Sequence, residues 1–231
     1  LRFVAEEHAG VGERGFLDLS QGLVRFLGVL GLVAMLVMLQ PDLGGFSVIA
    51  AMAMTVYFVA GAPWAHLAAL GAGGLALFGA LIKAAPYRAA RFMTFLHPEL
   101  DPRGVGYHIN QALLAIGSGG IAGLGLGHSR QKFLYLPEVA SDSIFAVIAE
   151  ELGFVLTLVF LALIVALIYR CASVASRTPD RFGRLLVIGV CGWFFGQTFF
   201  NVGSMAGLLP LTGLPLPFVS YGGSALMVSL A

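Results

Sequence analysis

Long apolar runs alternate with short polar segments along most of the chain. A transmembrane helix needs about 20 predominantly apolar residues. Glycine and proline inside such a run do not exclude a helix, because membrane helices tolerate both. The pattern therefore predicts an all-α fold, a polytopic transmembrane helix bundle forming a single integral membrane domain over residues 1–231. Its five complete spans and one truncated span are expected at 22–40, 44–62, 64–85, 144–169, 184–209 and from about 218 onward.

The composition supports a protein embedded in lipid. Of the 231 residues, 58% are hydrophobic and 11% are charged, and the mean hydropathy is +0.91. Soluble domains are about half apolar and about a quarter charged, so this chain has too few polar residues for a water-facing surface. The net charge of +1 gives no reason to expect a nucleic-acid partner. The start has neither an initiator Met nor a signal-peptide core, and we expect a fragment lacking its first helices and the end of its last.

A long connection of 58 residues, 86–143, separates the third and fourth expected spans and is too polar to cross a membrane. Loops of this length are usually functional or disordered. Its apolar and aromatic residues argue against disorder. Residues 108–116 are expected to form a short interfacial helix, which the glycines between 117 and 127 would end.

Basic residues predict the orientation. The connection 170–184 carries four arginines and one acid, Asp180, which places it in the cytoplasm by the positive-inside rule. Counting spans from there puts 86–143 outside, as an extracytoplasmic loop. The resulting tally of seven basic residues inside and six outside shows almost no bias. Either the topology is inverted or the outer cations bind an anionic ligand; the four clustered arginines favour the second interpretation.

Three carboxylates stand where the fourth apolar run begins: Asp142, Glu150 and Glu151. On a continuous helix Asp142 and Glu150 would lie about 12 Å apart along the axis on one face, with Glu151 pointing elsewhere. Ionisable groups at membrane depth require a partner or a wet cavity. Glu150 and Glu151 therefore either pair within the bundle or take part in function. Asp142 is either a helix N-cap or a functional acid.

Two further stretches carry candidate chemistry. "SRQK" at 129–132 puts Arg130 and Lys132 two residues apart, which fits an anion clamp or a solvated loop. The stretch "LLPLTGLPLPFVSYGGSALM" combines prolines and glycines with the hydroxyls of Ser220 and Tyr221. Non-helical backbone at membrane depth survives only inside protein or along a wet cavity. This stretch therefore predicts either the wall of an outward-facing cavity or a stiff turn.

Long motifs in the chain resemble those of the SEDS family of shape, elongation, division and sporulation proteins, the FtsW/RodA/SpoVE group. They are "QPDLGG", "GVGYHINQALLAIGSGGIAGLGLGHSRQKFLYLPE", "SDSIFAVIAEELGF" and "NVGSMAGLLPLTGLPLPFVSYGGSALM". Their order and spacing match the family over nearly the whole chain. The wording "SRQKFLYLPE" is most similar to the division branch, FtsW.

The resemblance implies a fold of about ten transmembrane helices, of which this chain would hold the end of the fourth through part of the tenth. It implies a peptidoglycan glycosyltransferase that polymerises glycan strands from lipid II at the outer face of the bacterial cytoplasmic membrane, at the division septum. The implied partners are a class B penicillin-binding transpeptidase and other division-complex membrane proteins. It implies no certain cofactor; a divalent cation could offset the diphosphate charge.

The resemblance also assigns residues. The family's essential carboxylate lies in "TDFIFA", which reads "SDSIFA" here, so Asp142 is the expected catalytic base. The family's "EAHTD" is "EVASD" here, which changes the expected hydrogen-bond partners of that acid, and "SYGGSS" is "SYGGSA". The substrate-binding candidates, with Glu150 expected to orient a cation, are Arg130, Lys132, Glu138, Glu150, Ser220 and Tyr221.

Two other classes of function remain open from the residues. Polar groups within a helix bundle also suit a flippase or transporter of the same lipid, although here they gather on one side of the expected bilayer. A non-catalytic scaffold that recruits a transpeptidase would tolerate substitution of every carboxylate. Polymerisation, lipid-translocation and partner-binding assays separate these classes.

Overall fold

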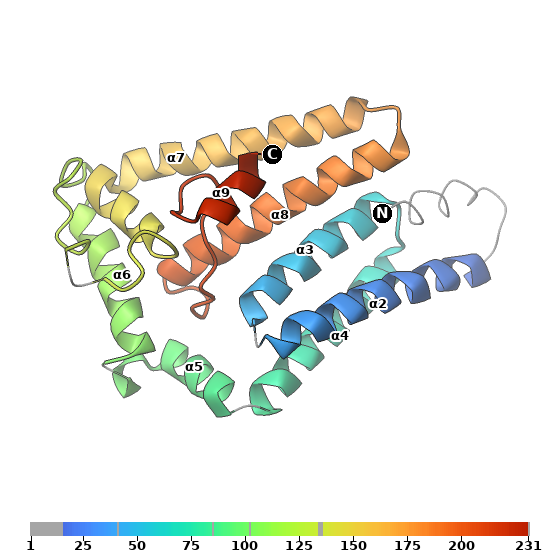
Figure 1. The fold of residues 1–231 in the computed structure, drawn as a ribbon, viewed down its shortest axis with the longest axis horizontal. Helices are drawn as coiled ribbons and strands as arrows, with labels where there is room; N and C mark the ends of the chain where they lie inside the picture. Colours follow the sequence, from blue (N-terminus) through green and yellow to red (C-terminus); the bar gives the residue numbers. More distant parts are fainter. Residues whose placement is uncertain (1–15, 41, 85, 102, 134–135, 231) are drawn as a thin grey trace. The chain divides into compact units, whose positions relative to one another are not determined.

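The computed structural model describes residues 16–40, 42–84, 86–101, 103–133 and 136–230, and these form helices joined by turns, with no strand among them (Figure 1). This confirms the predicted all-α class. In chain order the elements are α2 (Phe16–Leu39), α3 (Leu43–Val59), α4 (Trp64–Ala84), α5 (Pro86–Leu96), the 3₁₀ turn η2 (Pro98–Leu100), α6 (Val105–Gly119), α7 (Ile144–Arg177), α8 (Arg181–Met205) and α9 (Gly223–Leu230).

The chain forms two compact units, and α4, α7 and α8 contribute to both. The first covers residues 1–76 and 166–196, and the second covers 77–165 and 197–231. In the first unit Phe26 of α2 stacks on Tyr57 of α3 with ring centroids 4.6 Å apart. Gly192 of α8 lies close to Thr55 of α3, where an added Cβ would be 3.1 Å from the threonine Cβ. The expected single domain stays a prediction.

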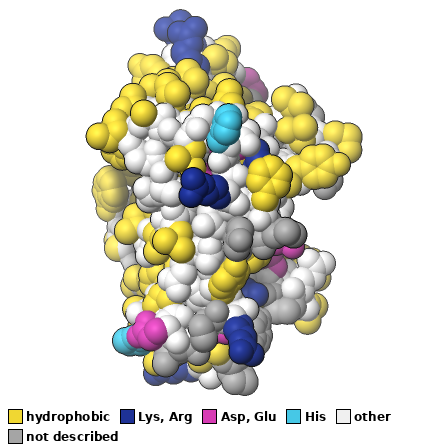
Figure 2. Space-filling view, turned by 90° about the vertical axis from the view of Figure 1, so that its left-hand side faces the viewer, with side chains coloured by type: hydrophobic (Ala, Val, Ile, Leu, Met, Phe, Trp, Pro, Cys, Tyr) yellow, Lys and Arg dark blue, Asp and Glu magenta, His cyan; other side chains and the backbone are white. Residues whose placement is uncertain are grey.

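Helix lengths and exposed apolar side chains are those of a membrane protein. Among the described residues, α7 and α8 are long and apolar enough to cross a bilayer, and shorter apolar helices cover 26–39, 43–59 and 64–80. Large hydrophobic side chains also lie in the open beside isolated charged ones (Figure 2). In water this exposure would oppose folding, whereas in a bilayer these side chains face lipid. The predicted polytopic membrane bundle is thereby supported.

The largest departure from the predicted elements is in the long connection. α5 was not expected, and α6 continues through Gly117 to Gly119, beyond the predicted end of a helix over 108–116. About half of the connection is therefore helical. Elsewhere α3 and α4 match the predicted spans to within three residues, whereas α2 begins at Phe16, six residues early. α7 continues to Arg177, eight residues beyond its predicted end and into the connection 170–184. α8 ends at Met205, four residues early, and α9 begins at Gly223, five residues late.

α7 is not the continuous helix that the sequence suggested, because it breaks at Gly153. That residue has φ 73° and ψ 179°, a region occupied almost only by glycine. The short piece before the break, 144–152, is largely buried, whereas Phe154 and Val155 directly after it are more than half exposed. Glu150 and Glu151 thus precede the exposed apolar stretch of α7 and lie in a protein-lined part of the chain.

The glycine-rich segment 120–125 fills the break in α7. Leu124 and Gly125 donate their backbone N–H to the carbonyls of Glu150 and Glu151, each at 3.0 Å. In the other direction, Phe154 and Val155 donate to the carbonyls of Gly120 and Ile121 at 2.9 and 3.3 Å. Backbone groups that a broken helix leaves unpaired are therefore satisfied within the protein, which membrane depth requires.

Candidate functional site

The candidate catalytic acid lies in a compact turn, residues 137–143, that leads into α7. Ser141 and Ser143 donate their N–H to the carbonyl of Glu138, at 3.1 and 3.2 Å, and Glu138 has φ 48°, in the left-handed region. Ser143 directly precedes α7, so Ser143 stands at the cap position that the sequence had offered to Asp142. The turn leaves the Asp142 side chain half-buried.

Two carboxylates share one hydroxyl in this turn. Ser141 Oγ lies 2.6 Å from Asp142 Oδ1 and 3.0 Å from Glu138 Oε2. A serine hydroxyl has a single proton and can donate to only one of them at a time. The carboxylate left without that donor must be satisfied from outside the turn, by water, a proton or a cation. This makes the pair Asp142 and Glu138 a place where a proton can be accepted.

The segment that follows α8 holds the turn from its other side. Asn201 of α8 donates its side-chain amide to the carbonyls of Asp142 and Leu214, at 2.8 and 2.7 Å. Ser220 donates to the carbonyl of Ser141 and accepts from the N–H of Leu216 at 2.7 Å. These bonds fix the Pro/Gly-rich stretch beside the candidate base; that it forms the wall of a cavity stays a prediction.

The two predicted hydroxyl residues of this stretch differ in exposure. Ser220 is 4% exposed and its hydroxyl is engaged by the backbone, whereas Tyr221 is 85% exposed and donates its N–H to the carbonyl of Ala140 at 2.7 Å. Gly213 faces the candidate base, since an added Cβ would lie 3.5 Å from Asp142 Oδ2. Substrate contact by Ser220 and Tyr221 stays a prediction.

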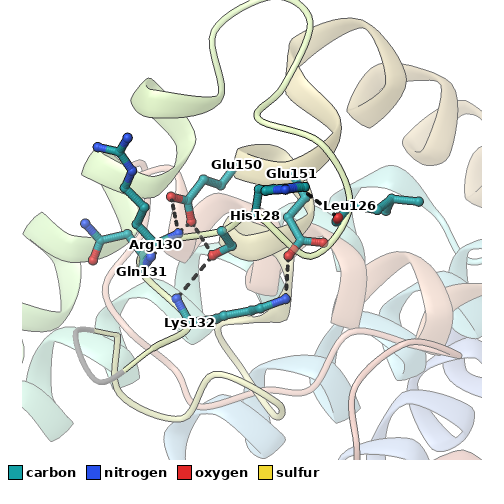
Figure 3. A network of polar contacts seen from close by, with 8 residues as sticks. Leu126, His128, Arg130, Gln131, Lys132, Glu150 and Glu151 are labelled. Atoms are coloured by element: carbon teal, nitrogen blue, oxygen red, sulfur yellow. Dashed lines mark hydrogen bonds and ion pairs between the residues drawn. The ribbon is translucent and has the colours of Figure 1, made fainter.

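Glu150 holds a second polar cluster, in which it is 1% exposed. Its carboxylate accepts from the hydroxyl of Ser129 and from the backbone N–H of Arg130 and Gln131, and Figure 3 shows it beside the turn that carries the last two. The Ser118 hydroxyl lies 3.3 Å from the carboxylate and 2.9 Å from the carbonyl of Ala115. A buried carboxylate is stable when several donors satisfy it. Glu150 therefore fixes the turn that carries Arg130, through its backbone and not through its guanidinium.

The two predicted anion-binding cations have different surroundings. The Arg130 side chain is exposed and extends away from Glu150 (Figure 3). Lys132 Nζ lies 2.7 Å from Glu151 Oε1, in a partly exposed ion pair, and 5.4 Å from the centroid of the Phe133 ring. Arg130 is thus open to an anion, whereas Lys132 is already paired with Glu151. Their binding roles stay predictions.

His108 of α6 also contacts the turn, and the sequence did not single it out. Its Nε2 lies 2.6 Å from Ser143 Oγ, and Ser143 is fully buried. Burial lowers the pKa of His108 from its ordinary value and outweighs the nearby carboxylates of Asp142 and Glu138, which raise it. The 35 residues between His108 and Ser143 hide the contact from any spacing rule. The one available signal is "SDSIFA", with Ser143 where the family motif has Phe.

Metal binding by protein side chains alone does not fit the site. Among the described residues, no cluster of three or more His, Cys, Asp or Glu side chains could hold a metal ion. Asp142 and Glu138 together offer two carboxylates. Magnesium is commonly bound by one or two carboxylates together with substrate phosphates and water. The residues present therefore fit a divalent cation that a diphosphate substrate helps to bind.

The fold and the site define a multi-pass helical membrane protein with an acidic, hydroxyl-lined centre at the start of one helix. The family model described as "Cell cycle protein", FTSW_RODA_SPOVE, matches residues 13–231, and the chain belongs to this FtsW/RodA/SpoVE family. The predicted membership in the SEDS group is thereby confirmed. The relatives also support a multi-pass protein of the bacterial inner membrane.

Curated relatives agree with this assignment. The chain is 42% identical over 218 residues to stage V sporulation protein E of Bacillus subtilis, covering 94% of this chain and 60% of that protein. It is 46% identical over 213 residues to the probable peptidoglycan glycosyltransferase FtsW of Thioalkalivibrio sp., covering 91% and 53%. The chain thus spans little more than half the length of these relatives.

Two solved structures share the fold. One, described as "Structural coordination of polymerization and crosslinking by a peptidoglycan synthase complex", matches with a TM-score of 0.72 at 32% identity, covering 99% of this chain and 63% of that one. The other is a mutant of the rod shape determining protein RodA of Thermus thermophilus, with a TM-score of 0.62 at 32% identity, covering 99% and 58%.

Proposed function

We propose that this chain is part of a peptidoglycan glycosyltransferase that polymerises glycan strands from lipid II at the outer face of the cytoplasmic membrane, during septal wall synthesis in cell division. The observation that carries the proposal is the Asp142 carboxylate, half-buried at the start of α7 and sharing the Ser141 hydroxyl with Glu138. Relatives named as probable peptidoglycan glycosyltransferases support the same reaction class.

Asp142 serves as the general base in this proposal. It takes the proton of the attacking sugar hydroxyl as the glycosidic bond forms, and such a group contributes about 10²–10⁴-fold to the rate. Ser141 keeps the carboxylate in place through the 2.6 Å bond to Oδ1. Oδ2 is not part of that bond and faces Gly213, where an added Cβ would lie 3.5 Å from it.

Cations stabilise the departing diphosphate. Arg130 is the leading candidate because its guanidinium is exposed, and Glu150 fixes the turn that bears it. Lys132 contributes if the diphosphate competes with Glu151 for its ammonium group. A divalent cation bound by Asp142 or Glu138 together with the diphosphate would supply further charge neutralisation. The donor lipid would keep its tail in the bilayer.

The proposal includes a partner. A glycan polymerase needs its product to be crosslinked, and a solved relative of this chain belongs to a peptidoglycan synthase complex that coordinates polymerisation with crosslinking. The partner we propose for this protein is accordingly a class B penicillin-binding transpeptidase, with other membrane proteins of the division complex.

The substitution Asp142→Asn in the full-length protein tests the function. The amide keeps an oxygen for Ser141 but cannot accept the substrate proton at neutral pH, so glycan polymerisation from lipid II should fall by about 10²–10⁴-fold. Membrane insertion and thermal unfolding should be unchanged. Asp180→Asn is the matched control, because Asp180 caps α8 through Gly183 N and Asn caps helices equally well. Normal strand synthesis by Asp142→Asn would exclude Asp142 as the base.

A further inference from the structure

The hydrogen bonds around Ser143 determine which His108 nitrogen carries the proton. Ser143 Oγ lies 2.8 Å from the carbonyl oxygen of Pro137 and 2.6 Å from His108 Nε2. The carbonyl can only accept, so the single hydroxyl proton of Ser143 is donated to Pro137. His108 Nε2 must then carry a proton and donate it to Ser143. In the neutral ring, Nδ1 is therefore the nitrogen without a proton.

This pair adds a buried polar contact between the turn and α6, which also share an apolar core. Ser143 closes the turn 137–143 through Pro137, and His108 lies on α6, whose residues Ala112 and Ala115 pack in the same core as Ala146 of α7. Removing His108 leaves a fully buried hydroxyl without its second partner and removes this polar contact between the turn and α6, while the apolar packing of Val139 remains. The residue displaced most directly is Asp142, which is the chain neighbour of Ser143.

We infer that His108 is a positioning residue for Asp142, acting through Ser143 and the turn 137–143. Nothing in the chemistry of the pair requires His108 to touch the substrate. The inference rests on the proposed function insofar as Asp142 is the base. The part of the inference that concerns structure, namely that His108 orders the turn 137–143, does not depend on the reaction.

The charges near His108 give the pair a pH dependence. Asp142 and Glu138 of the turn act on the imidazole and raise its pKa, while burial lowers it by more. Other elements that pack against α6 also carry charged groups. Glu150 of α7 is hydrogen-bonded to the 129–131 turn. Glu99 of η2 and Arg91 of α5 are exposed.

Protonation at Nδ1 preserves the bond to Ser143 and places a positive charge beside Asp142. That charge attracts the Asp142 carboxylate and competes with the sugar hydroxyl for it. The window lies below the ordinary pKa of histidine, because burial has lowered the pKa of His108. Acidification through this window should therefore charge His108 and reduce turnover, an effect that a side chain without a titratable group at position 108 would lack.

Three variants of the full-length protein test the inference. His108→Gln retains an N–H donor for Ser143 but cannot titrate, so it should keep kcat within about threefold at pH 7.5 and show a shallower acid limb in its pH profile. His108→Ala should lower kcat at least about tenfold with little change in KM, because it displaces the base and not the substrate. His97→Gln, which alters an exposed histidine paired with Glu99, should change neither.

Hydrogen exchange separates failure of this inference from failure of the proposed function. In His108→Ala, amides of the turn 137–143 should exchange faster, while those of 120–125, bonded to α7, should keep their wild-type rates. Faster exchange in a protein that does not polymerise lipid II would retain the positioning role and overturn the function. Unchanged exchange, full kcat in His108→Ala, or superimposable pH profiles of wild type and His108→Gln would each overturn the inference.

Discussion

The Glu150 carboxylate is 1% exposed, and hydrogen-bond donors of the surrounding chain stabilise it in place of a cation. Each of its two carboxylate oxygens faces a backbone N–H, of Arg130 at 3.0 Å and of Gln131 at 3.4 Å, and the Ser129 hydroxyl donates to it as well. Replacing one carboxylate oxygen by an amide nitrogen would point a donor at donors. A group left unsatisfied in this way costs about 1–3 kcal/mol. The residue type is therefore set by the turn that it holds.

Glu150→Gln should accordingly lower the free energy of unfolding by about 1–3 kcal/mol and accelerate amide exchange in 129–132. Glu151→Gln is the matched control, since it removes a partly exposed ion pair with Lys132, worth about 1 kcal/mol or less. Thermal unfolding in detergent with hydrogen exchange provides both measurements. Equal effects of the two variants would contradict the distinct role of Glu150.

For single residues, the sequence is a better guide to which side chains are functional than to which side chains they contact. Asp142 was recognisable because an acid precedes an apolar run within a familiar motif. His108 was not, because its contact with Ser143 joins positions 35 residues apart in the chain. The pairing of Lys132 with Glu151 was equally hidden, since two adjacent glutamates differ only in the direction that the fold gives them.

Among the elements, α7 contains a feature that hydropathy could not predict, the break at Gly153. The apolar pattern correctly located a helix over 144–169, but Gly153 looked like any other glycine within a membrane span. Its backbone angles and its closeness to Gly123, where a Cβ on Gly153 would lie 2.2 Å from the Gly123 nitrogen, come from tertiary packing. Likewise the glycines between 117 and 127 were expected only to end a helix, yet those of 120–125 form a close backbone contact with α7.

Gly153→Ala tests the break. The backbone angles alone disfavour alanine by about 1–3 kcal/mol, and the contact with Gly123 adds to this, so the variant should unfold at clearly lower temperature or fail to accumulate in the membrane. Gly73→Ala in α4 is the control, because an added Cβ there meets nothing within 4 Å and alanine favours the helix. A Gly153→Ala protein as stable as the Gly73→Ala protein would rule out a tight contact at the break.

For the whole molecule, the decisive property is the side of the membrane on which the carboxylate centre lies. The arginines of 170–184 predict that this connection is cytoplasmic and that 86–143 is outside, where lipid II would be consumed. The bundle class followed from the apolar runs and the composition. The side rests on the four arginines of 170–184, while the whole tally of seven basic residues inside and six outside shows almost no bias, which is why it needs a measurement.

Single-cysteine labelling provides that measurement. In a background in which Cys171 and Cys191 are replaced, a cysteine substituted for Leu126, which is 76% exposed, should react with an impermeant maleimide in intact cells. A cysteine substituted for Ser176, exposed near the end of α7, should react only after the membrane is permeabilised. The reverse pattern would place Asp142 in the cytosol and exclude polymerisation at the outer face.

The paired break in α7 has a consequence for how the protein is made. The two segments that form this contact, 120–125 and the residues of α7 on either side of Gly153, must both be present before the break can be stabilised. Segment 120–125 precedes Gly153 in the chain. When the nascent α7 leaves the ribosome, its partner has therefore already been synthesised. The backbone hydrogen bonds across the break can form as soon as residue 155 emerges, before α8 or any later part of the polypeptide has been synthesised.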